Sequence, residues 1–276
     1  MNTSLLNANR MVVSTSLPAG RAVERLLSPL DQFAEKSPQF ISRSLGQFQS
    51  AGRTYSLPRY VYLGPKGGGD VVRIGIFATI HGDEPEGALA LTRFVGELEK
   101  NPEIAKGYVL YFYPVCNPTG FEDNTRHSRG GKDLNREFWR ESPEPEIRYL
   151  ESEICLHAFD GIITLHSDDT SDGLYGFVSG SVLTENLLEP ALREAEQFLP
   201  RNRRKTIDGF AAQRGIVTSG YSGVLKSVPG LSRPPFEITF ETPQKSPLSR
   251  QVAATAAALR TILLEYRYLI ALAQNI

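Results

Sequence analysis

Four short runs of apolar residues divide the chain, and each has the length of one β-strand. Two of them are continuous rather than alternating, which is typical of strands covered on both faces. Helical patterns separate some of the runs. This order predicts an α/β fold, a single domain in which a mixed, mostly parallel twisted sheet carries helices on both faces. The four predicted central strands span 71–80, 108–115, 161–166 and 236–241.

Other segments flank these strands. Residues 1–35 are predicted to form an N-terminal extension that ends in an amphipathic helix. Residues 36–276 are predicted to form the main domain. The segment 53–64 is predicted to be an outer strand, because Pro58 is tolerated near a sheet edge. The apolar positions of the N-terminal helix are Val23, Leu26, Leu27, Leu30 and Phe33. Those of a helix predicted within 144–159 are Ile147, Leu150, Ile154 and Leu156.

The composition is that of an ordinary soluble protein. The 276 residues are 41% hydrophobic and 22% charged, and a net charge of −1 gives no argument for binding nucleic acid or an acidic membrane. No stretch approaches the ~20 apolar residues of a membrane helix, and the N-terminus lacks a signal-peptide pattern. We therefore expect a cytoplasmic protein. Cys116 and Cys155 are too few for a disulfide framework and are expected to be buried.

Two histidines and a glutamate stand where predicted strands end. His81 follows the first central strand, Glu84 comes three residues later, and His166 ends the third. If these strands are parallel neighbours, the three side chains meet at the carboxyl edge of the sheet, where ligands collect in α/β proteins. Two imidazoles and one carboxylate, with a fourth position for water, are typical of a catalytic zinc site. The alternative is that Glu84 caps a helix and His81 is an ordinary hydrogen-bonded histidine.

The loop that follows the second central strand is rich in groups that bind carboxylates. It spans 116–138 and contains Arg126, Asn135 and Arg136 around a Gly-Gly turn. Arginine offers a two-pronged donor for a carboxylate, and asparagine adds a neutral donor. An arginine beside a metal can also stabilise an oxyanion. The alternative is a solvated basic loop.

A carboxylate ends the last central strand. Glu241 would lie at the same sheet edge as the predicted metal, where it could move protons as a general base and acid. Glu237 is the rival, four residues earlier on the same side of the strand. It is expected instead to pair with Arg233 or another charge. We therefore favour Glu241.

These motifs together resemble those of a known family. HGDE at 81–84, NPTGF at 117–121, DLNREF at 133–138, LHS at 165–167 and FET at 240–242 occur in the order found in the zinc carboxypeptidases. The spacing is similar to that of their compact bacterial branch, which includes murein-peptide amidases and grades into the succinylglutamate desuccinylase and aspartoacylase relatives. The resemblance covers about 70–245 and implies a carboxypeptidase A-like fold.

The resemblance implies a role for each motif residue. His81, Glu84 and His166 would bind one Zn²⁺ per chain. Arg126 falls where the family has the arginine that polarises the scissile carbonyl. Glu241 falls where the family has its general base.

The resemblance also implies how substrate would bind. Asn135 and Arg136 fall where the family holds the free carboxylate of the substrate. A mobile tyrosine is common before the last strand, and Tyr221 is the tyrosine of the corresponding segment, 214–230. The family's usual Asp in NPDG is Thr119 here, which we expect to alter a loop rather than the chemistry.

The same segment should line the side-chain pocket of the substrate. Val224 and Leu225 would make that pocket apolar, whereas Lys226 would let it accept acids. The acidic turn at 168–173 is expected to be solvated, although it could help to admit a cationic substrate.

Three functions follow from these features. The first is a zinc metallocarboxypeptidase that cleaves an amide next to the free carboxylate of a peptide or murein peptide. The second is an N-acyl-amino-acid deacylase with the same catalytic residues. The third is a catalytically silent zinc- or ligand-binding protein. In the first two, the partner is a small peptide or acyl-amino-acid substrate. No nucleic-acid or membrane partner is expected, and the pattern leaves the oligomeric state open.

Overall fold

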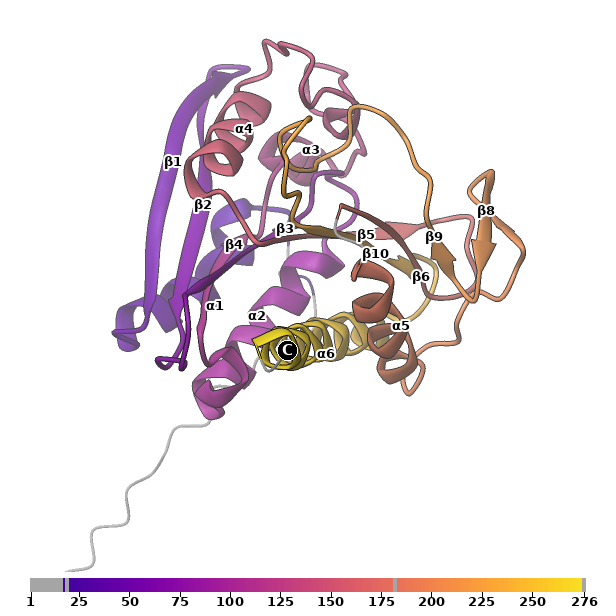
Figure 1. The fold of residues 1–276 in the computed structure, drawn as a ribbon. Helices are drawn as coiled ribbons and strands as arrows, with labels where there is room; N and C mark the ends of the chain where they lie inside the picture. Colours follow the sequence, from indigo (N-terminus) through magenta and orange to yellow (C-terminus); the bar gives the residue numbers. More distant parts are fainter. Residues whose placement is uncertain (1–16, 18–19, 181–182, 275–276) are drawn as a thin grey trace, which may run out of the picture.

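The computed structural model describes residue 17 and residues 20–180 and 183–274. Within these residues, ten strands form one sheet in the order β1-β2-β4-β3-β5-β10-β6-β9-β8-β7 (Figure 1). The four strands at its centre, β4, β3, β5 and β10, pair in parallel, and pairs toward both edges are mainly antiparallel. The strands are β1 (Phe40–Ser50), β2 (Arg53–Leu63), β3 (Val72–Ala78), β4 (Tyr108–Tyr113), β5 (Gly161–Asp168), β6 (Tyr175–Gly180), β7 (Thr206–Ile207), β8 (Phe210–Gln213), β9 (Ile216–Val217) and β10 (Phe236–Pro243).

Helices cover both faces of this sheet. The long helix α6 lies between α2 and α5 on one face, and α1 contacts α2 there, whereas α4 lies on the other face (Figure 1). The predicted α/β architecture and its four central strands are therefore confirmed. The helices are α1 (Val23–Lys36), α2 (Glu86–Lys100), α3 (Pro118–Asp123), α4 (Pro145–His157), α5 (Thr184–Ala195) and α6 (Leu248–Gln274), with 3₁₀ turns η1 (Pro102–Ala105) and η2 (Leu134–Arg136).

Helix α1 is held by packing rather than by its own backbone. Pro29 lies inside it, and an interior proline costs about 3 kcal/mol because it removes a hydrogen bond and crowds the preceding turn. The five predicted apolar positions are all buried, and each contributes roughly 1.5–3 kcal/mol. Their burial outweighs the proline, so the helix persists. These side chains belong to the same core cluster as the inner faces of α2 and α6.

Three predictions made from the sequence were wrong. The segment 53–64 forms β2, but β2 is second from the edge, because β1 pairs along its outer side. Cys155 is exposed rather than buried. Leu156 is 72% exposed, because the buried face of α4 is set by Ile147, Leu150 and Ile154, and a residue two positions beyond Ile154 points away from it.

The two faces of the sheet carry separate cores. The larger core lies under α1, α2, α5 and α6, and the smaller one lies between the sheet and α4. On the α4 side, Ile162 of β5 belongs to the smaller core. Farther along this face, the side chains of β5, β10 and β6 line a cavity instead of packing under a helix. This uncovered part of the sheet is where the site is built.

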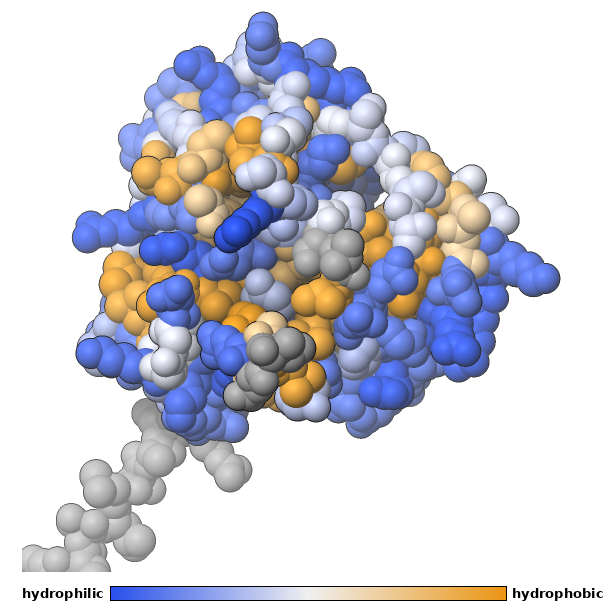
Figure 2. Space-filling view, in the orientation of Figure 1, coloured by the Kyte–Doolittle hydropathy of each residue, from blue (hydrophilic) through white to orange (hydrophobic). Residues whose placement is uncertain are grey.

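Polar residues cover most of the face shown in Figure 2, and apolar residues occur on it in separate patches. The most exposed large apolar side chains of the described residues are Leu156, Tyr268 and Val71. None of the helices in the described part of the chain has both the length and the apolarity needed to cross a lipid bilayer. The cytoplasmic location stays a prediction.

Stability should depend on pH through Glu146, in the first turn of α4. It is 2% exposed, and burial raises its pKa to about 7. Between its unfolded pKa of about 4.3 and about pH 7, the folded chain keeps a proton that the unfolded chain has released, so stability falls. Above pH 7 the full penalty applies. We expect Glu146→Gln to raise the free energy of unfolding at pH 8 by up to about 3 kcal/mol.

The measurement is urea unfolding at pH 4.5 and pH 8. Glu185→Gln is the matched control, since Glu185 lies in the first turn of α5 but is exposed. At pH 4.5 the Glu146 variant should nearly match the wild type, because this pH is close to the unfolded pKa and the burial penalty has only begun to appear. An equal gain at both pH values would show that the effect does not come from ionisation.

Candidate active site

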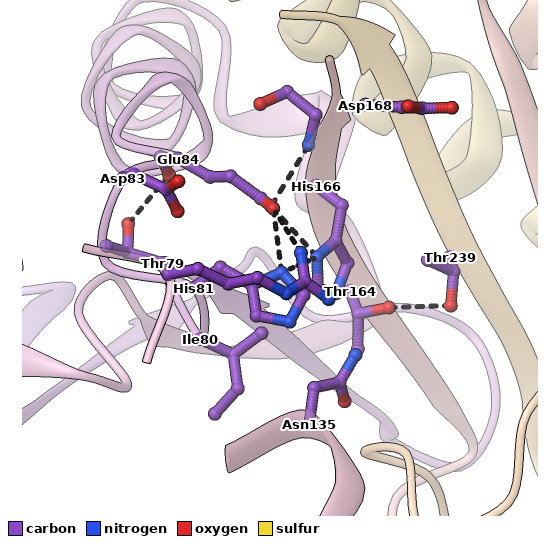
Figure 3. Close-up of polar contacts among 12 residues, drawn as sticks. Thr79, Ile80, His81, Asp83, Glu84, Asn135, Thr164, His166, Asp168 and Thr239 are labelled. Carbon is purple, nitrogen blue, oxygen red and sulfur yellow. Dashed lines mark hydrogen bonds and ion pairs between the residues drawn. The ribbon is translucent and has the colours of Figure 1, made fainter. Parts of the chain in front are cut away.

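Two strand ends bring His81, Glu84 and His166 together. His81 follows β3, and His166 lies near the end of β5, which pairs directly with β3. Nδ1 of His81 is 2.7 Å from Oε1 of Glu84, and Nδ1 of His166 is 3.0 Å from Oε2 (Figure 3). The two Nδ1 atoms are 3.2 Å apart, and one ligand atom from each residue lies within 4.8 Å of the others. All three side chains are buried.

The backbone between β3 and α2 is bent to aim these groups. Thr79 has a φ of 54°, which is a rare conformation for a β-branched residue and costs on the order of 1–3 kcal/mol. Its carbonyl accepts a hydrogen bond from the N–H of Asn117, so the turn is held by the next loop. A Cβ at Gly82 would lie 1.9 Å from the carbonyl carbon of Gly120. Only glycine therefore fits between His81 and Asp83.

Other groups hold the cluster in place. Nε2 of His81 lies 3.3 Å from Oδ1 of Asp133, and the N–H of Ser167 donates to Oε2 of Glu84 at 3.1 Å. The Arg126 guanidinium donates to Oδ2 of Asp133 at 3.2 Å and reaches Oε1 of Glu84 at 3.5 Å. Asp133 was not among the site residues predicted from the sequence. The available signal was an acidic residue at the head of the DLNREF motif.

Charge and burial set the protonation of the cluster. Burial would raise the pKa of Glu84, but His81 and His166 hold it below its usual range. Burial lowers the pKa of His166, which favours its neutral form. Burial would also lower the pKa of His81, but the Glu84 charge and the hydrogen bond with Asp133 raise it overall. A neutral imidazole and an ionised carboxylate are the forms that bind metals.

The cluster fits a divalent metal ion. Its two imidazole nitrogens and one carboxylate converge on one point, and the other nitrogen of His81 faces Asp133. A carboxylate behind a histidine ligand is the usual way to orient it and set its tautomer. The residues present therefore suit a metal that is held by three protein groups.

Glu241 stands next to this cluster. On β10 it pairs with His166 of β5 on one side and with Tyr175 of β6 on the other, so all three side chains share one face of the sheet. Its side chain is almost buried, with 9% of the residue exposed. Burial, followed by the charges of Glu84, Asp168 and Asp208, raises its pKa well above the ordinary value. A carboxylate in this position is a strong proton acceptor.

The remaining predicted residues line the same cavity, which has a volume of about 630 Å³. The Arg136 guanidinium lies 4.3 Å from the centre of the Tyr221 ring and donates to the carbonyl oxygen of Asn135. Oδ1 of Asn135 accepts from the N–H of Leu225 at 2.9 Å, which leaves the amide nitrogen of Asn135 as a donor. The structure thus places Arg126, Asn135, Arg136 and Tyr221 in the same cavity as the cluster.

A segment we call the pocket loop, residues 218–227, forms one wall of the cavity. It is anchored on the 135–140 segment: the Phe138 N–H donates to the carbonyl of Gly223, and the Trp139 indole donates to that of Lys226. Gly223 has a φ of 76°, and a Cβ there would lie 2.4 Å from the carbonyl oxygen of Arg136. These contacts fix the loop over the sheet.

Comparison with known proteins identifies the fold. Residues 70–202 match the succinylglutamate desuccinylase/aspartoacylase catalytic domain. No curated protein matches the sequence significantly. Among solved structures, a protein of Shewanella baltica proposed to be a metallopeptidase has a TM-score of 0.74 at 22% identity. The match covers 88% of this chain and 92% of the Shewanella chain.

Two enzymes from other bacteria are also similar. A metallo-carboxypeptidase from Burkholderia cenocepacia has a TM-score of 0.68 at 18% identity, covering 90% of this chain and 69% of its own. A metallo-carboxypeptidase from Pseudomonas aeruginosa, in complex with (2-guanidinoethylmercapto)succinic acid, has a TM-score of 0.66 at 19% identity. The match covers 88% of this chain and 68% of the Pseudomonas chain. At these identities the likeness concerns the fold.

Loss of one imidazole should remove the metal. We expect His166→Ala to abolish stoichiometric binding, because two protein groups remain where three converge. The measurement is metal content by mass spectrometry after dialysis against trace zinc. His127→Ala is the control, since His127 is an exposed histidine outside the cluster. One bound equivalent in the His166 variant would refute this ligand assignment.

Asp133 should strengthen metal binding without touching the metal. We expect Asp133→Asn to weaken affinity by about 10–100-fold, because His81 loses the carboxylate that orients it. Competition with a chromogenic chelator measures the dissociation constant. Asp123→Asn is the control, because Asp123 pairs with Arg129 and not with the cluster. Equal affinities in both variants would rule out this role.

Proposed function

We propose that this chain is a zinc-dependent hydrolase of amide bonds next to a free carboxylate, a function supported by its carboxypeptidase-like fold and by the match over residues 70–202. One observation carries the proposal. The His81–Glu84–His166 cluster, Glu241 and the Asn135–Arg136 pair line one cavity. A proton acceptor and a carboxylate-binding pair beside a metal site are what this reaction requires.

Zinc is the metal that the ligand set, two imidazoles and one carboxylate, favours. Two nitrogens that each lie roughly 2.0–2.1 Å from a tetrahedral zinc ion are about 3.3 Å apart. The Nδ1 atoms of His81 and His166 are 3.2 Å apart, close to that value, and the two Glu84 oxygens lie 2.7 Å and 3.0 Å from them. A zinc ion held there would supply a Lewis acid for the carbonyl and for the attacking water.

Glu241 is the group that moves protons. Its raised pKa makes it a stronger base than an exposed carboxylate, and it faces the cavity from the same sheet face as His166. It accepts a proton from the attacking water and later delivers that proton to the departing amine. Arg126 donates to the carbonyl oxygen as negative charge develops, from its position 3.5 Å from Glu84.

Asn135 and Arg136 bind the carboxylate of the departing residue. The guanidinium supplies two parallel donors, and the Asn135 amide supplies a third. Tyr221 stacks on that guanidinium and limits its movement. The Pseudomonas aeruginosa neighbour binds a succinic acid derivative, which carries free carboxylates and supports this type of substrate.

Two substrate classes fit this chemistry. Neighbours that are metallo-carboxypeptidases favour a peptide or a murein peptide. The match to the succinylglutamate desuccinylase/aspartoacylase domain favours an N-acyl amino acid. A cavity of about 630 Å³ is large for a short acyl group and a small amino acid, so we place the peptide first.

A mixed substrate panel distinguishes these classes. Zinc-loaded protein is incubated with C-terminally free peptides, murein peptides and N-acyl amino acids, and the products are read by mass spectrometry. Release of a terminal amino acid supports the first class, and release of small acyl groups alone supports the second. Bound zinc with no product from any member would favour the silent-binder alternative.

Glu241→Gln should separate chemistry from metal binding. The amide has the size of the carboxyl but cannot accept the proton, so we expect kcat to fall by about 10²–10⁴-fold. Zinc content should stay at the wild-type level, because Glu241 is outside the His–Glu–His cluster. Asp172→Asn, which removes a surface carboxylate paired with Arg204, should leave turnover unchanged. Wild-type turnover in the Glu241 variant would exclude it from the mechanism.

A further inference from the structure

The floor of the cavity is a regular grid of side chains from three strands. In β5, β10 and β6, residues that pair across the strands face the same side of the sheet. Three such rows run from the metal end along the strands, and all nine residues line the cavity. The rows are His166–Glu241–Tyr175, then Thr164–Thr239–Phe177, then Ile162–Glu237–Ser179.

The rows differ in chemistry. The first contains the proposed proton acceptor. The middle row is neutral, and its two threonine hydroxyls bond to each other at 2.8 Å (Figure 3). The third row contains a second carboxylate, Glu237. A cavity that begins at a metal site therefore ends at a negative charge.

Glu237 is held by neutral donors. Its Oε1 accepts from the N–H of Ser227 at 2.8 Å and from the Ser227 hydroxyl at 2.6 Å, and Oε2 accepts from the Ser179 hydroxyl. No Lys, Arg or His nitrogen among the described residues lies within 4.0 Å of it, so the expected pairing with Arg233 is absent there. The carboxylate is positioned by the end of the pocket loop, but its charge is not neutralised by a nearby cation.

The rest of the lining is also acidic. Seven acidic and three basic side chains of the described residues face the cavity. Two of the basic ones, Arg126 and Arg136, are assigned above to the carbonyl and the carboxylate of the substrate. Lys226 is the third, and it is not ion-paired with Glu237. The acidic residues are Asp83, Glu84, Asp168, Asp169, Asp208, Glu237 and Glu241.

Distance selects the length of the side chain that can reach Glu237. Successive rows on one face of a sheet are about 6.6 Å apart, so Glu237 lies roughly 13 Å along β10 from Glu241. A short side chain would end near the threonine row. The α-carbon of the released residue lies beyond the scissile carbonyl, which sits at the first row. From there, four methylenes or a guanidinium arm would carry the charged end past the threonine row, where the Glu237 side chain can reach it from the third row.

We propose that the cavity is selective for a substrate whose released residue carries a long cationic side chain, and that Glu237 binds the charged end of that side chain. The proposal rests on the proposed function for the position of the scissile amide. Lysine and arginine have the required length and charge. Glu237 is half-buried, so a positive charge beside it loses part of its solvation, and the carboxylate offsets that loss for a cationic side chain but not for an apolar or acidic one.

Kinetics test the selectivity. The substrates are blocked dipeptides that differ only in the last residue, which is Lys, Arg, ornithine, Leu or Glu. We expect kcat/KM to be highest for Lys and Arg, lower for the shorter ornithine, and lowest for Glu. Glu237→Gln should reduce kcat/KM for the Lys substrate by on the order of 30-fold or more, with less than about a threefold change for Leu. A preference for Leu or Glu in the wild type would overturn the proposal.

A second variant separates charge from loop position. Ser227→Ala removes a hydrogen bond that holds Glu237 but leaves its charge. We expect this variant to retain the preference for Lys over Leu. If Ser227→Ala removed the preference for Lys over Leu as fully as Glu237→Gln does, Glu237 would act by positioning the pocket loop and not by its charge. The proposal would then be wrong.

Binding of a free amino acid tests the proposal without turnover. Calorimetry compares L-lysine with L-norleucine, which has nearly the same shape but lacks the ammonium group. We expect lysine to bind zinc-loaded protein more tightly by at least tenfold, and Glu237→Gln to remove that difference. Equal binding of the two by the wild type would contradict the proposal.

The two assays distinguish failure of this proposal from failure of the proposed function. Cleavage of the Leu or Glu substrate without a cationic preference would support amide hydrolysis and overturn the role of Glu237. Glu237-dependent lysine binding without cleavage of any substrate would support the role of Glu237 and overturn the hydrolase.

Discussion

Parallel pairing of β3, β5 and β10 is the constraint on which the site depends. His81 and His166 are 85 residues apart, and Glu241 is a further 75 residues along the chain. They meet because β5 pairs with β3 and β10 in parallel, with His166 opposite Glu241. A slip of one residue in the pairing of β10 would turn Glu241 to the opposite face. The cores on the two faces oppose such a slip, because it would expose Phe240 and Ile238.

Several acidic side chains are concentrated at this edge of the sheet, where burial disfavours their ionised forms. Glu84, Asp133 and Glu241 are wholly or partly buried within one region, and burial alone would raise the pKa of each. For Glu84 and Asp133, nearby histidines and arginines reverse that effect. Glu241 has Arg126 as its compensating charge and stays raised. The same sheet edge thus holds one ionised carboxylate suited to a metal and another suited to accept a proton.

The cavity floor would let the proposed enzyme measure its substrate along the strands. Because rows repeat at a fixed spacing along the strands, Glu241, Thr239 and Glu237 stand at regular depths on one face. The pocket loop contacts the far end of the floor through Ser227, and the metal end through Leu225 and Tyr221. The proposed catalytic groups are therefore supplied by strand ends, and the cavity walls by loops that the sheet positions.

The sequence by itself determined the four central strands, the amphipathic face of α1 and the candidate ligands at strand ends. These features depend on side-chain patterns within a few residues, which act on the backbone locally. Tertiary structure alone decided that Asp133 faces His81 and that Glu237 bonds Ser227 rather than Arg233. It also placed β1 at the edge of the sheet and left Leu156 exposed. The reason is physical: loop paths and strand partners are set by packing between distant segments, and no local period encodes them.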